Sequence, residues 1–271
     1  VATASSAKYM AMSTFTANAS NVNYAWANGT TQIFQSTSAT TTGYGLTNLV
    51  FAASNGGSIV FTSPVVIQNP AGTGTVTLAG TITDTASYPS SFTVRAGGRI
   101  VDSSSAKVAI ATHGAPVIFN ANTSGDATSV SGGITLYGSI STNGGNITLG
   151  GGTAGNASSY ANGGSAASYT GNLSGITLNG ATISSASGDI VMRGRAITDD
   201  GLNINGSTIT TTGAGTILID AVGSHGLAFT TLPSTVQSSS GYISINANGT
   251  SWEGLGDWGT SGTSGILSSS G

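Results

Sequence analysis

A short strand pattern that recurs along the chain constrains its fold more than any other feature. In each copy, apolar and polar residues alternate and a Gly or Asn ends the run, as in Gly175-Ile-Thr-Leu-Asn-Gly180. Alternation with period 2 puts Ile176 and Leu178 on one face of a strand and Thr177 on the other. One face of each strand is therefore expected to be buried. The pattern recurs at 76–80, 134–138, 147–150, 190–194, 202–206, 217–220 and 243–246.

The connections between these strands indicate how the chain continues. Single Gly or Asn residues tolerate positive φ and turn a corner, but they are too short to build a sandwich of hairpins. Strands that keep turning the same way wind into an all-β parallel solenoid, with coils stacked about 4.8 Å apart. Successive strand starts lie 12 to 15 residues apart. This spacing agrees with three strands per coil of about 20 residues or four per coil of about 27, and we favour three.

Three of the repeats resemble a known family. The strings Gly144-Gly-Asn-Ile-Thr-Leu-Gly-Gly-Gly152, Gly188-Asp-Ile-Val-Met-Arg-Gly194 and Gly213-Ala-Gly-Thr-Ile-Leu-Ile-Asp220 look like repeats of filamentous-haemagglutinin-type exoproteins. That family consists of large secreted bacterial adhesins, and the resemblance implies a right-handed parallel β-helix at the cell surface. It covers residues 130–250 well and 56–130 loosely. The Asn-Pro-Asn-Gly signature of the family's secretion domain does not occur, so the chain looks like a shaft or a relative of the family.

Composition excludes several classes of partner. Six Lys and Arg and a net charge of −3 leave no basic patch for nucleic acid. The absence of Cys excludes disulfides and thiolate metal sites, and we expect no cofactor. No apolar run is long enough for a membrane-spanning helix. The sequence opens without a basic and apolar leader, so we expect a secreted protein already processed, or an excised fragment.

The chain divides into three segments by pattern. Residues 1–50 are an irregular cap or assembly segment, 51–250 carry the β-helix, and 251–271 form a second cap or tail. A solenoid's end coils leave backbone and core uncovered, so atypical ends either cap them or join the next subunit in an end-to-end homopolymer. The candidate capping or assembly residues are the aromatic side chains Tyr9, Tyr24, Trp26, Tyr44, Trp252 and Trp258.

Residues 150–173 interrupt the repeat as an insertion loop. Tyr160 and Tyr169 stand there among Gly, Ser, Ala and Asn. Tyr among small polar residues is typical of adaptable binding loops, which makes these two side chains candidates for contact with a cell-surface glycan. A linker without a ligand has the same composition.

Catalysis requires a separate test, because polysaccharide-cleaving enzymes also use parallel β-helices. Asp199-Asp200 lies one short coil before Ser224-His225-Gly226, and inverting glycoside hydrolysis needs two carboxylates across a cleft. The Asn-Thr-Asp and Arg-Ile-Lys elements of polygalacturonases do not occur, so we expect no enzyme. We interpret His113 and His225 as corner residues. The Gly-Gly-x-Gly-x-Asp repeats of calcium-binding β-rolls do not occur either.

Pairs of hydroxyl residues separated by one apolar residue raise one more alternative. They occur at 75–77, 81–83, 139–141, 182–184 and 208–210. Outward Thr is the ordinary polar face of a strand, but flat ladders of Thr on a solenoid can order water and bind ice.

Our hypothesis is a secreted structural rod, the subunit or shaft of an extracellular filament, sheath or adhesin. The alternatives are a polysaccharide-cleaving β-helix enzyme and an ice- or glycan-binding solenoid.

Overall fold

The structure is a computed structural model of all 271 residues. It describes residues 8–11, 14–17, 21–24, 32–35, 48–53, 58–69, 74–87, 89–102, 104–123, 132–154, 156–163, 174–259 and 265–269. Side chains are described mainly between residues 58 and 257.

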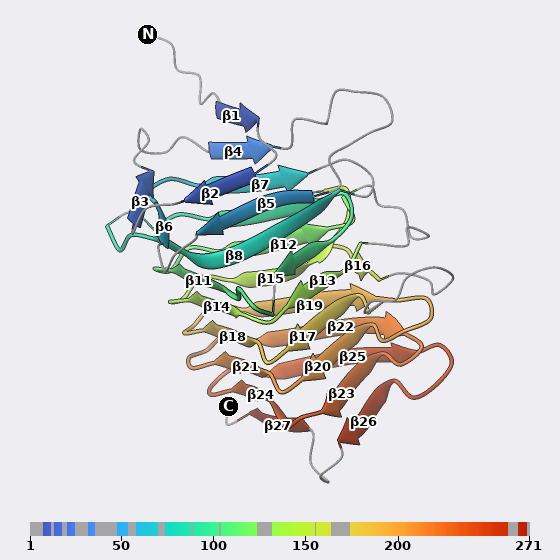
Figure 1. The fold of residues 1–271 in the computed structure, drawn as a ribbon. Helices are drawn as coiled ribbons and strands as arrows, with labels where there is room; N and C mark the ends of the chain where they lie inside the picture. Colours follow the sequence, from blue (N-terminus) through green and yellow to red (C-terminus); the bar gives the residue numbers. More distant parts are fainter. Residues whose placement is uncertain are drawn as a thin grey trace.

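The chain winds as a right-handed parallel β-solenoid with three sheets, which confirms the predicted fold class (Figure 1). Sheet A consists of β1 (Lys8–Ala11), β4 (Gln32–Gln35), β7 (Val65–Asn69), β9 (Phe92–Ala96), β12 (Val117–Ala121), β15 (Ile147–Gly151), β19 (Ile190–Arg195), β22 (Ile217–Gly223) and β25 (Ile243–Gly249). The short β16 (Ala161–Asn162) also pairs with β19.

The other two sheets share one long strand, β8 (Thr75–Asp84), which turns the corner between them. Besides the first half of β8, sheet B contains β2 (Thr14–Ala17), β5 (Asn48–Ala53), β10 (Ile100–Asp102), β13 (Ile134–Leu136), β17 (Ile176–Asn179), β20 (Leu202–Asn205), β23 (Leu227–Thr231) and β26 (Leu255–Gly259). Besides the second half of β8, sheet C contains β3 (Asn21–Tyr24), β6 (Ser58–Phe61), β11 (Val108–Thr112), β14 (Ser139–Thr142), β18 (Thr182–Ser185), β21 (Thr208–Thr211), β24 (Ser234–Ser238) and β27 (Gly265–Ser269).

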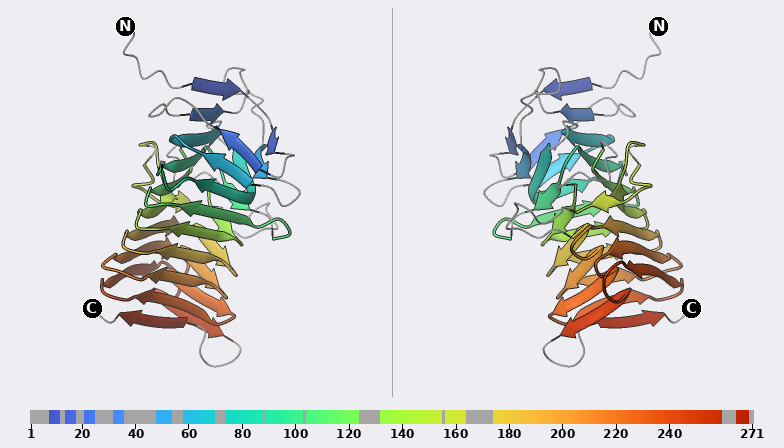
Figure 2. Two further views of the ribbon diagram at one scale, coloured as in Figure 1. Left: turned by 90° about the vertical axis from the view of Figure 1, so that its left-hand side faces the viewer. Right: turned by 90° about the vertical axis from the view of Figure 1, so that its right-hand side faces the viewer.

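Each turn contributes one strand to each sheet, so the predicted three strands per coil are confirmed. The predicted coil length of about 20 residues is wrong. Ile190 pairs with Ile217, which pairs with Ile243, so that one turn takes 26 or 27 residues. The difference lies in the corners, because residues 196–201 and 212–216 connect strands that a single Gly or Asn was expected to join. About six turns separate β7 from β24, and further strands continue the sheets at both ends (Figure 2).

The interior is filled by columns of like side chains. In sheet B, Ile134, Ile176, Leu202 and Leu227 stack on one another and are fully buried. Between β5 and β9, where aromatic side chains replace Ile and Leu, the rings of Phe51 and Phe61 lie 6.3 and 5.8 Å from that of Phe92. Each side chain in a column is buried by the like side chains of the turns above and below it. A turn is therefore stabilised by its neighbours, as expected of a solenoid. Among the residues that the structure describes, no helix is long and apolar enough to span a bilayer.

The sheets extend into both segments that the sequence set apart as terminal. Strands β1, β2 and β3 pair in parallel with β4, β5 and β6, and β26 and β27 continue sheets B and C at the other end. The side chains of Tyr9, Tyr24, Trp26, Tyr44 and Trp258 lie outside the described part of the chain. A capping or assembly role for these residues stays a prediction.

Candidate functional site

Asp200 and His225 form a polar corner between sheets A and B. Asp200 lies two residues before β20 and His225 two residues before β23, and Leu202 pairs with Leu227, so the two side chains occupy the same place in successive turns. Nδ1 of His225 is 2.8 Å from Oδ1 of Asp200, and Nδ2 of Asn203 donates to Oδ2 of Asp200 at 2.7 Å. Burial raises the pKa of Asp200, aided by the charge of Asp199, while the bonds from Asn203 and His225 oppose the rise.

Trp252 adds a third layer to this corner. Its indole stacks on the imidazole of His225, with ring centroids 6.1 Å apart and planes inclined by 28°. The side chain remains 67% exposed. The predicted capping residue Trp252 therefore covers the histidine and presents its own outer face to solvent.

Asp220 accepts hydrogen bonds from a second group of side chains on the outer face of sheet A. The hydroxyl of Tyr160 donates to Oδ2 of Asp220 at 2.8 Å, and Nδ2 of Asn246 donates to Oδ1 at 3.0 Å. Burial and the carboxylate of Asp220 raise the pKa of Tyr160. Tyr160, one of the two candidate ligand residues of the insertion loop, is therefore bound to the solenoid wall.

The described ends of the insertion loop also lie against the solenoid. Gly151 and Ser159 exchange two backbone hydrogen bonds of 2.8 and 2.9 Å, and β16 pairs with β19. Tyr169, the other candidate ligand residue, lies outside the described residues.

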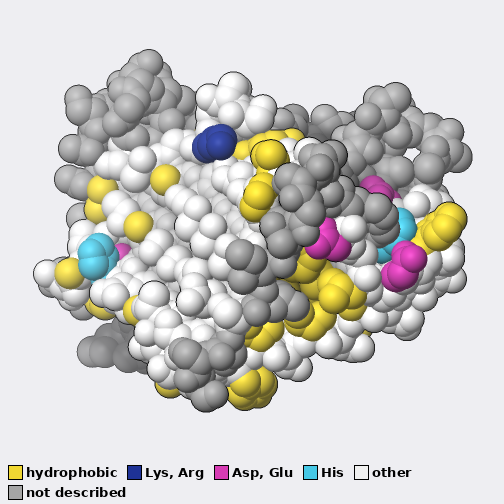
Figure 3. Space-filling view, turned by 90° about the horizontal axis from the view of Figure 1, so that it is seen from below, with side chains coloured by type: hydrophobic (Ala, Val, Ile, Leu, Met, Phe, Trp, Pro, Cys, Tyr) yellow, Lys and Arg dark blue, Asp and Glu magenta, His cyan; other side chains and the backbone are white. Residues whose placement is uncertain are grey.

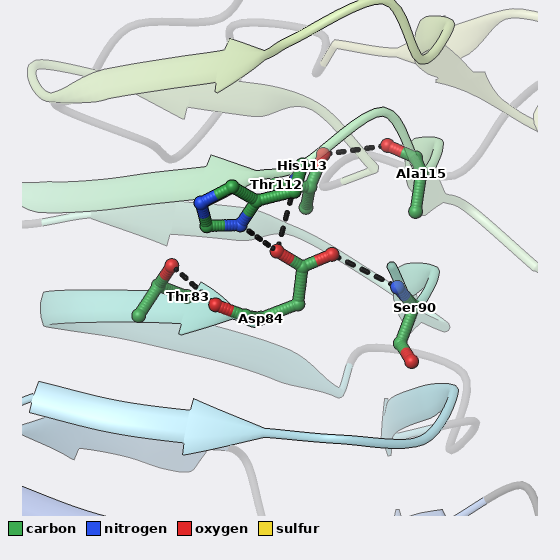
Figure 4. A network of polar contacts seen from close by, with 6 residues as sticks. All are labelled: Thr83, Asp84, Ser90, Thr112, His113 and Ala115. Atoms are coloured by element: carbon green, nitrogen blue, oxygen red, sulfur yellow. Dashed lines mark hydrogen bonds and ion pairs between the residues drawn. The ribbon is translucent and has the colours of Figure 1, made fainter. Parts of the chain in front are cut away.

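The second histidine is also paired with an aspartate, at a corner after sheet C (Figure 4). Nδ1 of His113 is 2.7 Å from Oδ1 of Asp84, and the backbone N–H of His113 donates to the same oxygen at 2.9 Å. The other oxygen of Asp84 accepts the backbone N–H of Ser90 at 2.8 Å. Both histidines lie at corners, as the sequence indicated. The sequence placed Asp199-Asp200 one coil before His225 without predicting the contact, and it gave no sign of Asp84 as the partner of His113. In the structure each Asp precedes its His by about one turn, 29 residues for His113 and 25 for His225.

Asp102 is a third corner carboxylate, and sequence reasoning missed it as well. It is the last residue of β10 and is buried. Oδ1 accepts the backbone N–H of Tyr137 at 2.6 Å, and Oδ2 accepts those of Gly138 at 2.7 Å and Val108 at 3.2 Å. Burial raises the pKa of Asp102 against the lowering effect of these hydrogen bonds. Asp102 thus joins its own corner to the next turn.

The contacts of these carboxylates are with the protein's own groups. Oδ1 of Asp199 accepts the backbone N–H of Asp200 at 2.9 Å, so the two adjacent aspartates have different partners. Among the described residues, no three His, Asp or Glu side chains gather as a metal site would require. The corner carboxylates instead connect neighbouring turns of the solenoid.

Among the side chains that the structure describes, the apolar core reaches the surface at the C-terminal turn. Ile243 and Ile245 continue buried columns of sheet A but are only partly buried. Leu255 pairs with Leu227, which is fully buried, yet it is itself 50% exposed. Figure 3 views the molecule from this end and shows apolar side chains grouped among uncharged ones, with few charged groups.

Comparisons with known proteins add no relative. No family model matches the chain, and neither a curated protein nor a solved structure matches it.

Proposed function

We propose that the protein is a structural rod, the shaft or a subunit of an extracellular filament, sheath or adhesin. The observation that carries this proposal is the open core at the C-terminal turn. Leu255 continues the inward column of Leu202 and Leu227 but is half exposed, whereas those two are fully buried. An apolar column that ends at the surface favours contact with a further turn of the same kind.

The two ends of the solenoid are compatible with such a contact. All pairings in the three sheets are parallel, so β25, β26 and β27 at one end run in the same direction as β1, β2 and β3 at the other. A second copy shifted along the axis would continue the three ladders. This head-to-tail contact does not close on itself and therefore produces a filament.

Composition supports the extracellular part of the proposal. Six Lys and Arg among 271 residues offer few sites to trypsin-like proteases, and the sequence is rich in Gly, Ser, Thr, Asn and Ala. Backbone ladders and buried columns shared by neighbouring turns resist bending, as a shaft requires.

Electron microscopy of the purified protein at several concentrations tests the proposal. Long uniform filaments that increase with concentration are expected. Isolated short rods at every concentration would reject self-assembly and leave the shaft role to a longer chain.

Two matched variants locate the contact. Leu255→Lys places a charge on the exposed end of the core, and Leu232→Lys places the same charge at a corner, where Leu232 is 52% exposed. We expect Leu255→Lys to abolish filaments and Leu232→Lys to keep them, with both variants retaining β circular dichroism. Filaments that survive Leu255→Lys would exclude this end as the joint.

A further inference from the structure

The outward residues of sheet C form two columns in exact register over six strands. Figure 1 shows these strands stacked one below another, from β8 through β11, β14, β18 and β21 to β24. The first column consists of Thr81, Ala109, Ser139, Thr182, Thr208 and Thr235. The second consists of Thr83, Ala111, Ser141, Ser184, Thr210 and Gln237.

The column between them, which points inward, keeps this face regular. It contains Ile82, Ile110, Ile140, Ile183, Ile209 and Val236, and none of these is more than 1% exposed. Because almost the same side chain supports every layer, the outward pairs lie at nearly the same height above the core. Four of the five hydroxyl pairs predicted from the sequence belong to this face. The fifth pair, Thr75 and Thr77, lies on sheet B.

The hydroxyls of this face are directed to solvent. Thr81, Thr182, Thr208 and Ser141 are exposed. Within the described part of the chain, only Thr83 among the outward hydroxyls donates to the protein, at 3.0 Å to its neighbour's carbonyl in Asp84. The others are left to bond water.

The outward faces of sheets A and B differ from that of sheet C, because one carries charged side chains and the other has buried Thr side chains. Sheet A carries Arg95, Arg193 and Asp220 at outward positions. On sheet B, Thr135 and Thr177 are only 8% and 4% exposed. The twelve positions of sheet C contain no charged side chain.

We propose that the outer face of sheet C binds ice. Neighbouring strands are about 4.8 Å apart and outward residues along a strand about 6.7 Å apart, a two-dimensional repeat close to that of oxygen atoms in ice. Hydroxyls at these points hold water in ordered positions, and the methyl groups of Thr and Ala fill the gaps between them. The neutral face matches a neutral water lattice, whereas a charged polymer would need opposite charges that the face lacks.

Ice itself is the probe, and thermal hysteresis is the measurement. The wild-type protein is expected to open a gap between the melting temperature of a single ice crystal and the temperature at which it grows, and to shape the crystal. Thr208→Tyr places a bulky ring at the fifth of the six positions of the first column and should reduce the gap several-fold. Thr148→Tyr makes the same substitution on the outer face of β15 in sheet A and should leave the gap unchanged.

Three results would overturn the proposal, provided that circular dichroism shows both variants folded. The first is ice growth unaffected by the wild-type protein at millimolar concentration. The second is an equal loss of hysteresis in both variants, because the effect would then not belong to sheet C. The third is a wild-type dimer that Thr208→Tyr alone dissociates in sedimentation, because the face would then join two copies of the chain.

Discussion

The imidazole of His225 lies 2.8 Å from the carboxylate of Asp200, although the two residues are 25 positions apart in the sequence. One full turn of the solenoid separates them, so a side-chain contact connects neighbouring turns beside the backbone ladder. Asp84 and His113 repeat this arrangement at another corner, at 2.7 Å. Corner carboxylates therefore act in addition to the buried columns to hold successive turns in register.

Removal of each imidazole should destabilise the protein to a different degree. His225→Ala leaves buried Asp200 with the amide of Asn203, whereas His113→Ala leaves Asp84 with the backbone N–H groups of Ser90 and residue 113. We expect His225→Ala to lower the free energy of unfolding by about 1–3 kcal/mol and His113→Ala to lower it less. Urea denaturation checks both values. A larger loss in His113→Ala would show that the backbone donors do not hold Asp84.

The alternation of apolar and polar residues was sufficient to predict the parallel solenoid, although it left three or four strands per coil open. It could not give the coil length, because residues 196–201 and 212–216 make corners longer than any strand pattern indicates. The pairing of Asp200 with His225 depends on that length, which explains why the sequence suggested their neighbourhood but not their contact. The contact of Tyr160 with Asp220 spans 60 residues and has no local signal.

Asp102→Asn should destabilise the protein strongly despite the similar shape of the two side chains. Both oxygens of Asp102 accept backbone N–H groups, from Tyr137 on one side and from Gly138 and Val108 on the other. Asn has one carbonyl oxygen, and its NH₂ group would face N–H donors. The expected loss is about 1–3 kcal/mol, measured by urea denaturation at pH 7. An unchanged free energy of unfolding would mean that water replaces the missing acceptor.

The pH dependence of stability tests the burial of the same carboxyl group. Burial raises the pKa of Asp102 above its ordinary value of 3.8, so the folded protein binds this proton more tightly than the unfolded chain. Its contribution to stability is therefore full below that value and is lost as the pH rises through the folded pKa. Subtracting the unfolding free energy of Asp102→Asn from that of the wild type, between pH 3 and 7, should give a difference that falls with pH. A difference that rises with pH would contradict the raised pKa.

Glycines at the corner between sheets C and A set a limit on how closely the turns can stack. A Cβ atom at Gly215 would lie 2.2 Å from the carbonyl oxygen of Gly188, and one at Gly241 would lie 2.2 Å from that of Gly215. The carbonyl belongs to the backbone of the adjacent turn and cannot move without disturbing the ladder. Gly215→Ala should therefore cost about 1–3 kcal/mol, whereas Ala214→Ser, at the exposed neighbouring position, should cost little. Thermal denaturation of the two variants measures the difference in stability. Equal melting temperatures would contradict the prediction, because the turns could then move apart at this corner without destabilising the protein.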